Sequence, residues 1–436
     1  MVSKEEKQRE QLQQMLQHIE DCMAEDLYDR AQEVLNTCLK LEVFDIRVYQ
    51  RYAFVLRMLD RVPAAELFEK VAMNPDDPEA YYAVAQALLK DNLFGSAINP
   101  LRKTIELVPM AANATFELAY ALLKEFRMED ALEHFKTAYE YSPSPNTAFY
   151  VAYTSLLSRD VEGAKALFPY MESEYAKHNQ EPVMLNILRD MVTRYEAFPP
   201  KDLRDWHFVQ YGTPLLRTSD EDLGEANENL NGRFVFINYG WLNVATILVT
   251  LKRLIEEVPG FPQYDYIIPA SMDVAPIAFA FSEMTGIPLV PREELNTTNK
   301  GFLFTSWSDE VRVVAEHMSH NPNVTLFAFS LGWTLQAPVC PDIIGYLDQA
   351  SRLPWQETML IHENGERTPR PAMQVPPEVV QYHILERVEG VDQAEVDKLI
   401  AYYQERAHLL KVGENINNPR LGFQIESPIE SIRMVV

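Results

Sequence analysis

The chain has 436 residues, 47% of them apolar, and its 39 basic against 64 acidic residues leave a net charge of −25. This length accommodates two or three domains with real cores, and the charge disfavours nucleic acid and anionic membrane surfaces as partners because no local basic patch offsets it. Cys22, Cys38 and Cys340 are far apart without CxxC spacing, which argues against a disulfide framework or a cysteine zinc site and favours a reducing cytoplasm.

The start of the chain shows no targeting segment. Its first residues, MVSKEEKQREQLQQ, are charged and polar throughout, so we expect no signal peptide. The apolar stretch 234–251 is interrupted by Asn238, Gly240 and Asn243. It therefore fits a strand, a turn and a buried helix better than a membrane span.

Residues 10–170 contain an internal repeat. Small alanines recur with a nearly constant period, and a large apolar residue lies four positions after each one. The alanines are Ala31, Ala64, Ala97, Ala131 and Ala164, and the apolar residues are Leu35, Phe68, Leu101, Phe135 and Phe168. Prolines close the units at Pro75, Pro109 and Pro143. The period predicts five helical hairpins.

This pattern resembles the tetratricopeptide repeat, in which two antiparallel helices of about 34 residues in all pack through a small residue and an aromatic one. The resemblance covers residues 8–175. Tyr81 and Thr115 stand where the family usually has Trp, and Ala85 and Ala119 where it usually has Gly. The resemblance implies a superhelix whose first helices line a concave groove that binds peptides or partner helices.

Aromatic residues recur with nearly the same period on the predicted first helices, and they either line the groove or pack helix on helix. One subfamily of these repeats holds a C-terminal carboxylate with Lys and Asn. This face instead carries aromatics, Gln86 and Glu117, so an apolar or aromatic-bearing segment suits it better. The candidate partner-binding residues are Tyr49, Tyr82, Gln86, Phe116, Tyr120 and Tyr150.

The first three units also resemble the repeat chaperones of bacterial type III secretion, which implies a groove that holds export substrates. Residues 176–197 are predicted to form a closing helix over the last repeat. Pro199 and Pro200 then break the helix, and the composition changes.

From residue 233 short apolar strands alternate with helices, which predicts parallel pairing with right-handed crossovers. A doubly wound sheet of this kind binds ligands at the C-terminal ends of its strands. The expected strands are 234–238, 265–270, 288–291, 301–307 and 325–331, and the expected helices are 241–257, 275–285 and 308–318.

Part of this region resembles the core of type I phosphoribosyltransferases. The resemblance covers about residues 234–335, and it implies a flexible hood at 291–300. The matching residues are Pro269, Pro276, Ile277, Ala278, Gly286, Ile287 and Pro288.

In that family the next strand ends in two acidic residues that hold ribose hydroxyls, and a Thr- and Gly-rich loop at a helix N-terminus holds a phosphate. Thr305 and Ser306 stand here in place of the acidic pair, and the following loop has no glycine. We therefore expect the shape of the family without its chemistry.

The acidic residues near this loop have a structural explanation. Ser308 is expected to cap a helix that carries Asp309 and Glu310 in its first turn, and Asp273 is expected to cap the helix that begins at 274. A residual site for a small anion or a nucleotide remains the alternative. The candidate ligand cleft comprises Asp273, Thr305, Ser306 and Ser308.

Other catalytic motifs are missing from the sequence. There is no dinucleotide, P-loop, zincin or α/β-hydrolase motif, and the pair His317 and His320 fits a helix end better than a metal site. We expect no cofactor and no metal. Helices are predicted near 377–388 and at 392–410, and the apolar end, 422–436, is expected to dock, with the repeat groove as one host.

The sequence thus predicts an α plus α/β protein. Its parts are an all-α repeat superhelix over 1–197, a linker over 198–232, a phosphoribosyltransferase-like α/β domain over 233–360, and a helical extension with a tail over 361–436.

We expect a cytoplasmic adaptor or scaffold without catalysis. Its groove would bind a protein partner and its α/β domain would be a second binding module, with no nucleic-acid partner and no membrane span. Two alternatives stay open. One is a nucleotide- or phosphoribosyl-binding enzyme or sensor with a non-standard phosphate loop, and the other is a chaperone of the type III secretion kind.

Overall fold

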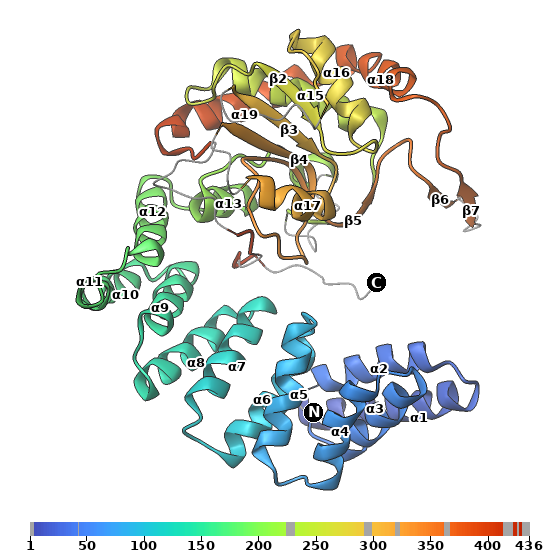
Figure 1. The fold of residues 1–436 in the computed structure, drawn as a ribbon, viewed down its shortest axis with the longest axis vertical. Helices are drawn as coiled ribbons and strands as arrows, with labels where there is room; N and C mark the ends of the chain where they lie inside the picture. Colours follow the sequence, from blue (N-terminus) through green and yellow to red (C-terminus); the bar gives the residue numbers. More distant parts are fainter. Residues whose placement is uncertain are drawn as a thin grey trace. The chain divides into compact units, whose positions relative to one another are not determined.

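The computed structural model describes residues 4–41, 43–223, 232–291, 299–318, 323–361, 367–412, 422–424 and 427–429. The chain divides into two compact units, Met1–Arg189 and Asp190–Val436 (Figure 1). None of the helices in the described ranges is long and apolar enough to cross a membrane.

The first unit is a series of helical hairpins. The first helices are α1 (Lys4–Ala24), α3 (Ile46–Met58), α5 (Pro78–Lys90), α7 (Ala112–Lys124) and α9 (Pro145–Leu157). The second helices are α2 (Tyr28–Lys40), α4 (Val62–Met73), α6 (Phe94–Leu107), α8 (Met128–Tyr141) and the short α10 (Val161–Lys165). After these come α11 (Phe168–Lys177) and α12 (Val183–Ala197), and α12 crosses the boundary between the units.

The first helices α3, α5 and α9 each begin after a residue whose side chain accepts a backbone N–H of the first turn. Asp45 accepts a hydrogen bond from the Arg47 N–H, and Asp77 accepts one from the Glu79 N–H, both at 2.9 Å. Ser144 forms a capping box with Thr147 at the start of α9. These caps supply acceptors for N–H groups that have no partner within the helix.

The turns between paired helices fix the repeat register. Each turn holds a non-glycine residue with positive φ, and a fully buried alanine lies five positions after it. The turn residues are Asp26, Asp60, Asn92, Phe126 and Arg159, and the alanines are Ala31, Ala65, Ala97, Ala131 and Ala164. The number of residues from the turn residue to the buried alanine is therefore the same in every hairpin, although the interval between successive turns is not constant.

This spacing corrects one member of the predicted alanine series. In the second hairpin Ala65 is the buried alanine, whereas Ala64 is only partly buried. The reason is geometric: the αL residue Asp60 sets where α4 begins, so the fourth residue of α4 meets its partner helix. The other four predicted alanines are confirmed as buried.

The second unit contains a five-stranded sheet in the order β1-β5-β4-β3-β2, in which every neighbouring pair is parallel. Its strands are β1 (Phe234–Asn238), β2 (Tyr266–Pro269), β3 (Gly301–Thr305), β4 (Val324–Gly332) and β5 (Ile343–Arg352). Strand β5 was not predicted, because its apolar run ends in polar residues, yet it lies between β1 and β4 in the sheet.

Helices cover both faces of this sheet (Figure 1). On one face, α15 (Trp241–Glu257), α16 (Ala275–Thr285), α18 (Pro377–Leu385) and α19 (Gln393–Arg406) share one apolar cluster with the strands. On the other face lie α13 (Leu203–Tyr211) and α17 (Ser308–Met318). The remaining elements are α14 (Ser219–Leu223), the hairpin β6 (Thr358–Ile361) and β7 (Arg367–Arg370), η3 (Val388–Gly390) and η4 (Ala407–Leu409).

The segment expected as a linker contributes to this unit. Residues 203–211 form the buried helix α13, whose last carbonyls, those of Val209 and Gln210, accept hydrogen bonds from the buried Arg194 guanidinium. The Leu216 N–H donates to the Ile344 carbonyl of β5 at 2.8 Å. The described part of 198–232 therefore packs as core rather than as a free connection.

The C-terminal extension packs on the same core. Val396, Leu399, Ile400 and Tyr403 of α19 are buried, whereas His408, in the η4 turn that follows, is exposed. Phe423 pairs its backbone with Ala337 within this unit. The remainder of the predicted tail segment lies largely outside the described residues.

Two other predicted features fall outside the description. Most of the expected hood at 291–300, namely 292–298, is not among the described residues. His320 is also outside them, and the structure describes only the backbone of His317, within α17.

Candidate functional sites

The first candidate site is the set of side chains that we call the first-helix face: Tyr82, Gln86, Phe116, Glu117, Tyr120 and Tyr150. Tyr82 and Phe116 are each the fifth residue of their helices, α5 and α7, so the repeat places them at matching positions. Both are half-buried, as are Tyr120 and Tyr150, whereas Gln86 is exposed. Their partial exposure leaves ring surface available for contact.

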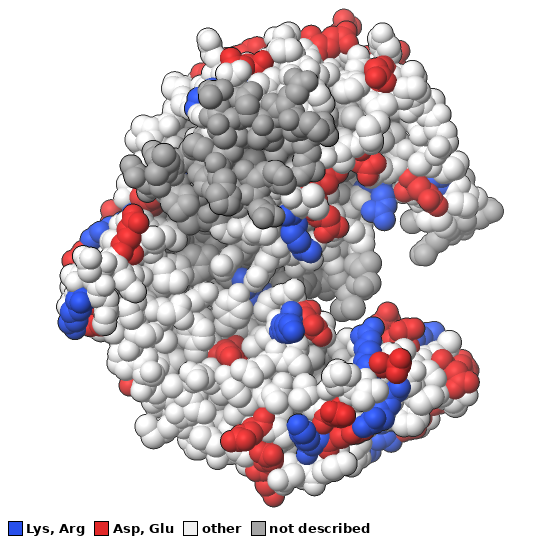
Figure 2. Space-filling view, viewed as in Figure 1, with Lys and Arg blue, Asp and Glu red and all other residues white. Residues whose placement is uncertain are grey.

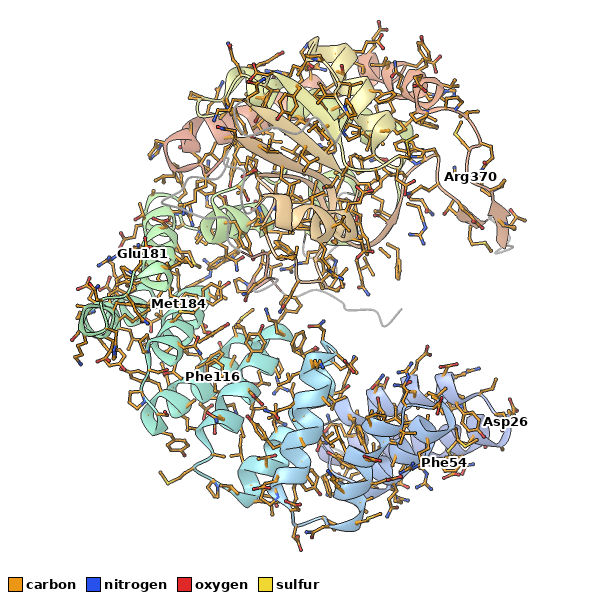
Figure 3. All side chains as sticks on the ribbon, viewed as in Figure 1. Asp26, Phe54, Phe116, Glu181, Met184 and Arg370 are labelled. Carbon is orange, nitrogen blue, oxygen red and sulfur yellow. The ribbon has the colours of Figure 1, made fainter. Side chains whose placement is uncertain are left out.

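The rings of this face touch across consecutive hairpins. The Phe116 and Tyr150 ring centroids are 5.2 Å apart and nearly perpendicular, and those of Tyr120 and Tyr150 are 5.8 Å apart. The buried Phe135 ring supports them from α8, stacked on Tyr150 at 5.1 Å. Such edge-to-face contacts hold the rings in a fixed arrangement. Figure 3 labels Phe116 on α7.

Tyr49 departs from the predicted row. It is the fourth residue of α3, matches Tyr81 of α5 and is 1% exposed. The two rings pack edge to face at 5.6 Å, which makes Tyr49 a helix-packing residue. The cause is unequal unit length: α3 and α5 begin closer together in the sequence than the period that links Tyr49 to Tyr82, so Tyr82 falls one position later in its helix.

Glu117 is the polar centre of the face, although it was not among the predicted site residues. The Tyr82 hydroxyl donates to its Oε1 at 2.9 Å, across two neighbouring hairpins. Its Oε2 is buried and has no hydrogen-bond partner among the residues that the structure describes. Burial raises the pKa of Glu117, and the nearby polar side chains of Tyr82 and Gln86 oppose that rise. The sequence analysis had already placed Glu117 on this face, beside Gln86.

The charged residues of this unit lie mainly elsewhere in the view of Figure 2. Lys, Arg, Asp and Glu gather there over α1–α4, whereas the surface over α7–α9 is mostly uncharged. The part of the repeats that carries the aromatic contacts thus has little charge on the side shown.

The second candidate site lies at the C-terminal ends of the strands. After β2 the chain forms α16 and then reaches Leu289, which pairs with Ile267 on the edge of β2 that faces away from β3. The chain then returns to the other edge of β2, where it forms β3. The helix after β3, α17, covers the opposite face from α16 (Figure 1). The winding therefore reverses between β2 and β3, which is where open α/β sheets bind ligands.

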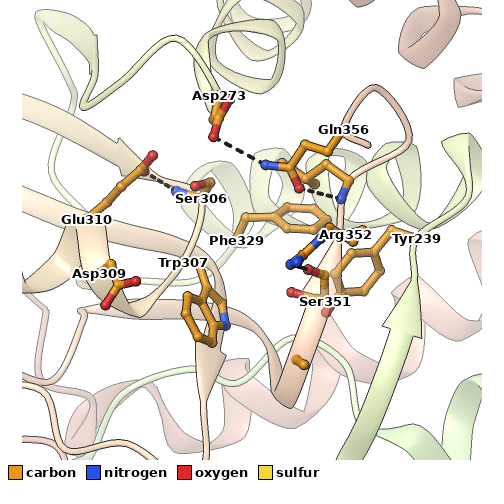
Figure 4. A pocket seen from close by; sticks show the side chains of 12 residues that line it. Tyr239, Asp273, Ser306, Trp307, Asp309, Glu310, Phe329, Ser351, Arg352 and Gln356 are labelled. Atoms are coloured by element: carbon orange, nitrogen blue, oxygen red, sulfur yellow. Dashed lines mark hydrogen bonds between the residues drawn. The ribbon is translucent and has the colours of Figure 1, made fainter. Parts of the chain in front are cut away.

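A pocket of about 210 Å³ opens at this point (Figure 4). Its apolar walls are Tyr239, Trp307, Phe329, Ala350 and Leu353, and its polar walls are Asp273, Ser306, Asp309, Glu310, Ser351, Arg352 and Gln356. This volume accommodates a small organic molecule.

Asp348, which the sequence did not indicate, lies beneath the pocket. It is fully buried and accepts hydrogen bonds from the Tyr239 hydroxyl at 2.6 Å, the Trp307 indole N–H at 3.1 Å and the Ser330 hydroxyl. Burial raises its pKa, and these donors oppose the rise. Asp348 therefore fixes the orientation of two pocket rings.

Two of the four predicted cleft residues line the pocket, Asp273 and Ser306. Thr305 is buried and donates to the Phe327 carbonyl at 3.1 Å. The Ser308 hydroxyl accepts from the Gly332 N–H at 2.6 Å. Both side chains are used in joining β3 and the start of α17 to β4.

Asp273 differs from its expected capping role. The hydroxyl of Ser271, not the Asp273 carboxylate, accepts the N–H groups of Asp273 and Val274 before α16. The Asp273 carboxylate accepts the Gln356 amide at 3.3 Å and faces the pocket (Figure 4).

The pocket disfavours an anion. The Ser306 N–H, which a bound phosphate would require, donates at 2.5 Å to the Glu310 carboxylate, whose other oxygen accepts the Ser271 hydroxyl. Asp273 and Asp309 add further negative charge, and among the described residues that line the pocket Arg352 is the one cation. An internal carboxylate thus occupies the backbone donor that a phosphate site would use.

Comparison with known proteins supports the interpretation of the N-terminal region as helical repeats. Residues 62–138 match the family model described as anaphase-promoting complex, cyclosome, subunit 3. No curated protein matches the chain. The N-terminal region therefore carries tetratricopeptide-like repeats.

Solved structures of repeat proteins are similar at low identity. MamA from Desulfovibrio magneticus RS-1 is 16% identical, with 41% of this chain and 98% of that chain covered and a TM-score of 0.26. YrrB, described as a TPR protein with an unusual peptide-binding site, is 17% identical, with 36% and 81% covered and a TM-score of 0.23. At these scores the similarity supports no conclusion about function.

Proposed function

We propose that this protein is an adaptor that binds a segment of a partner protein on the first-helix face of its repeats and performs no catalysis there. The observation that carries the proposal is the set of half-buried rings Phe116, Tyr120 and Tyr150, which contact one another across hairpins. Aromatic side chains with fixed orientation and partial exposure are the usual anchors of protein–protein contacts.

The neighbourhood of these rings favours an apolar or aromatic-bearing segment over an anionic one. The described carboxylate at the centre of the face is Glu117, which would repel a C-terminal carboxylate. A bound segment would cover ring surface on α7 and α9 while its polar groups meet Gln86 and Glu117.

Selection from a random peptide library on the full-length protein tests this proposal. We expect binding peptides whose affinity falls at least about tenfold in Phe116→Ala, the loss typical of an interface anchor. Tyr141→Ala is the matched control, because Tyr141 is an aromatic residue on the second helix α8 and is 37% exposed. Peptides that bind both variants as well as the unchanged protein would refute the proposal.

We further propose that the α/β unit is a second binding module with the shape, but not the chemistry, of a phosphoribosyltransferase. The pocket at the reversal of winding supports ligand binding, and Thr305, Ser306 and the Glu310 contact to the Ser306 N–H argue against a phosphorylated substrate.

Thermal-shift titration with phosphoribosyl pyrophosphate, nucleoside monophosphates and Mg²⁺ distinguishes two interpretations of the pocket: a binding module that takes no phosphorylated ligand, and a nucleotide- or phosphoribosyl-binding site. We expect no saturable stabilisation at millimolar ligand. A saturable shift that disappears in Ser306→Ala would instead support the alternative of a nucleotide- or phosphoribosyl-binding sensor or enzyme.

A further inference from the structure

The Glu117 carboxylate has one oxygen without a hydrogen-bond donor in the described part of the chain. Oε1 accepts the Tyr82 hydroxyl at 2.9 Å, while Oε2 is buried and accepts none there. A buried acceptor left without a donor costs about 1–3 kcal/mol, and more when it is charged. A donor supplied by a partner would recover this cost on binding.

The described residues around Glu117 supply polar groups but no compensating cation. Burial is the largest influence on its pKa, followed by the neutral side chains of Tyr82 and Gln86, and no described cation acts on it beside these. The cation on the same helix, Lys124, lies two turns further along with its ammonium 5.0 Å from the centre of the Tyr120 ring. The negative charge of Glu117 is therefore available for pairing.

Aromatic rings lie on both sides of this carboxylate along the helix. Phe116 precedes Glu117, and Tyr120 lies three positions after it, which brings the side chains of Glu117 and Tyr120 onto one side of α7. Tyr82 contacts Glu117 from the preceding hairpin, and Tyr150 packs against Phe116 and Tyr120. A carboxylate flanked by ring surface attracts a cationic side chain through an ion pair and through the rings.

We propose that the partner segment presents an Arg or Lys side chain to the first-helix face and that its cationic head pairs with the Glu117 carboxylate. This inference rests on the proposed binding function and specifies what the face recognises. The aliphatic stem of the Arg or Lys packs on the rings, and the head pairs with the buried carboxylate. A neutral amide donor fills the hydrogen bond but leaves the charge unpaired, so it binds less well.

The test compares peptides selected from the random library on the full-length protein and on Glu117→Gln. We expect Arg and Lys to be enriched among peptides selected on the unchanged protein and not among those selected on Glu117→Gln. Changing the Arg or Lys of a selected peptide to Gln should weaken binding about tenfold, as expected for a charged hydrogen bond, and have little effect on Glu117→Gln.

Two controls guard against loss of structure. Glu140→Gln removes an exposed carboxylate from the second helix α8 and should leave the enrichment unchanged. Glu117→Asp keeps the charge on a shorter side chain and should retain the preference for Arg and Lys at lower affinity. Thermal melts of all variants confirm that they fold.

The outcomes are distinguishable. Peptides that require Phe116 but show no preference for Arg or Lys, and that bind Glu117→Gln normally, would overturn this inference and leave the adaptor proposal intact. Peptides that ignore Phe116, or a library without binders, would overturn the adaptor proposal and this inference with it.

Discussion

The two units of this chain depend on contacts of different range. In the repeats, each buried alanine packs within a hairpin whose helices are adjacent in sequence. In the α/β unit, a single apolar cluster extends from Leu216 to Tyr403, and β5 lies between β1 and β4. Local contacts leave a period in the sequence, whereas long-range contacts leave none, so only the first unit could be predicted hairpin by hairpin.

The two units should also differ in how far a destabilising mutation spreads its effect. A repeat array is stabilised by each hairpin and by its contacts with nearby hairpins, so damage remains local. The Asn99 amide of α6 also donates to the Leu41 and Val43 carbonyls, so the third hairpin supports the end of the first. The sheet, by contrast, loses strands and helices together when its shared core is damaged.

The largest effect should follow Phe304→Ala. Phe304 is fully buried and packs against Phe281, Phe302 and Phe327, so its truncation should cost about 3–5 kcal/mol of unfolding free energy. Hydrogen exchange of the full chain should show protection lost together in β3 and in the distant helix α19. Retained protection in α19 would contradict a shared core. Phe236→Ala, on the 51% exposed Phe236 of β1, is the control and should have little effect.

Phe135→Ala is the matching change in the repeats. We expect a cost of about 3 kcal/mol, because the adjoining rings of Phe116 and Tyr150 can partly fill the space. Hydrogen exchange should rise in α7–α9 and remain unchanged in α1–α3. If α1–α3 lost protection equally, the repeat unit would be as cooperative as the sheet and the comparison would fail.

Acid should destabilise the α/β unit through His207. Burial, and to a lesser extent the nearby Arg194 charge, lowers the pKa of His207 from 6.5 to about 3. The unfolded chain therefore binds a proton below pH 6.5 that the folded chain does not, and the unfolding free energy falls as pH drops. The slope is about 1.4 kcal/mol per pH unit, so roughly 2 kcal/mol should be lost between pH 6.5 and 5.

Denaturant unfolding at pH 7, 6 and 5 measures this loss, and His207→Gln should remove that part of the pH dependence. The exposed His383 provides the control substitution, His383→Gln, which should keep it. An identical pH dependence in His207→Gln and the unchanged protein would show that His207 is not the group responsible.

The smallest effect should follow Tyr82→Phe, which removes one half-buried hydroxyl. We expect a loss of about 1 kcal/mol or less. Because the Tyr82 hydroxyl lowers the pKa of Glu117, that pKa should rise in the variant. A carboxyl-carbon NMR titration of Glu117 reads this directly, and an unchanged value would show that the two side chains are not hydrogen-bonded in solution.

Much of the first-helix face could be predicted from the sequence, and the errors in that prediction have a common cause. The aromatic period identified Tyr82 and Phe116, but a constant spacing placed Tyr49 and Ala64 one position out of register. The hairpins differ slightly in length because their αL turns set where each second helix begins, and a fixed period averages over them. The unsatisfied oxygen of Glu117 depends on the Tyr82 contact from another hairpin, which no local pattern encodes.

In the α/β unit the sequence determined many of the alternating strands and helices, including β1, α15, α16 and α17, because each is a continuous apolar or amphipathic run. Only the tertiary structure decided that β5 joins β1 to β4, that Asp348 orients Tyr239 and Trp307, and that Glu310 occupies the Ser306 N–H. Strand order and buried polar pairing arise between segments far apart in the chain, so their physical cause exists only once the chain is folded.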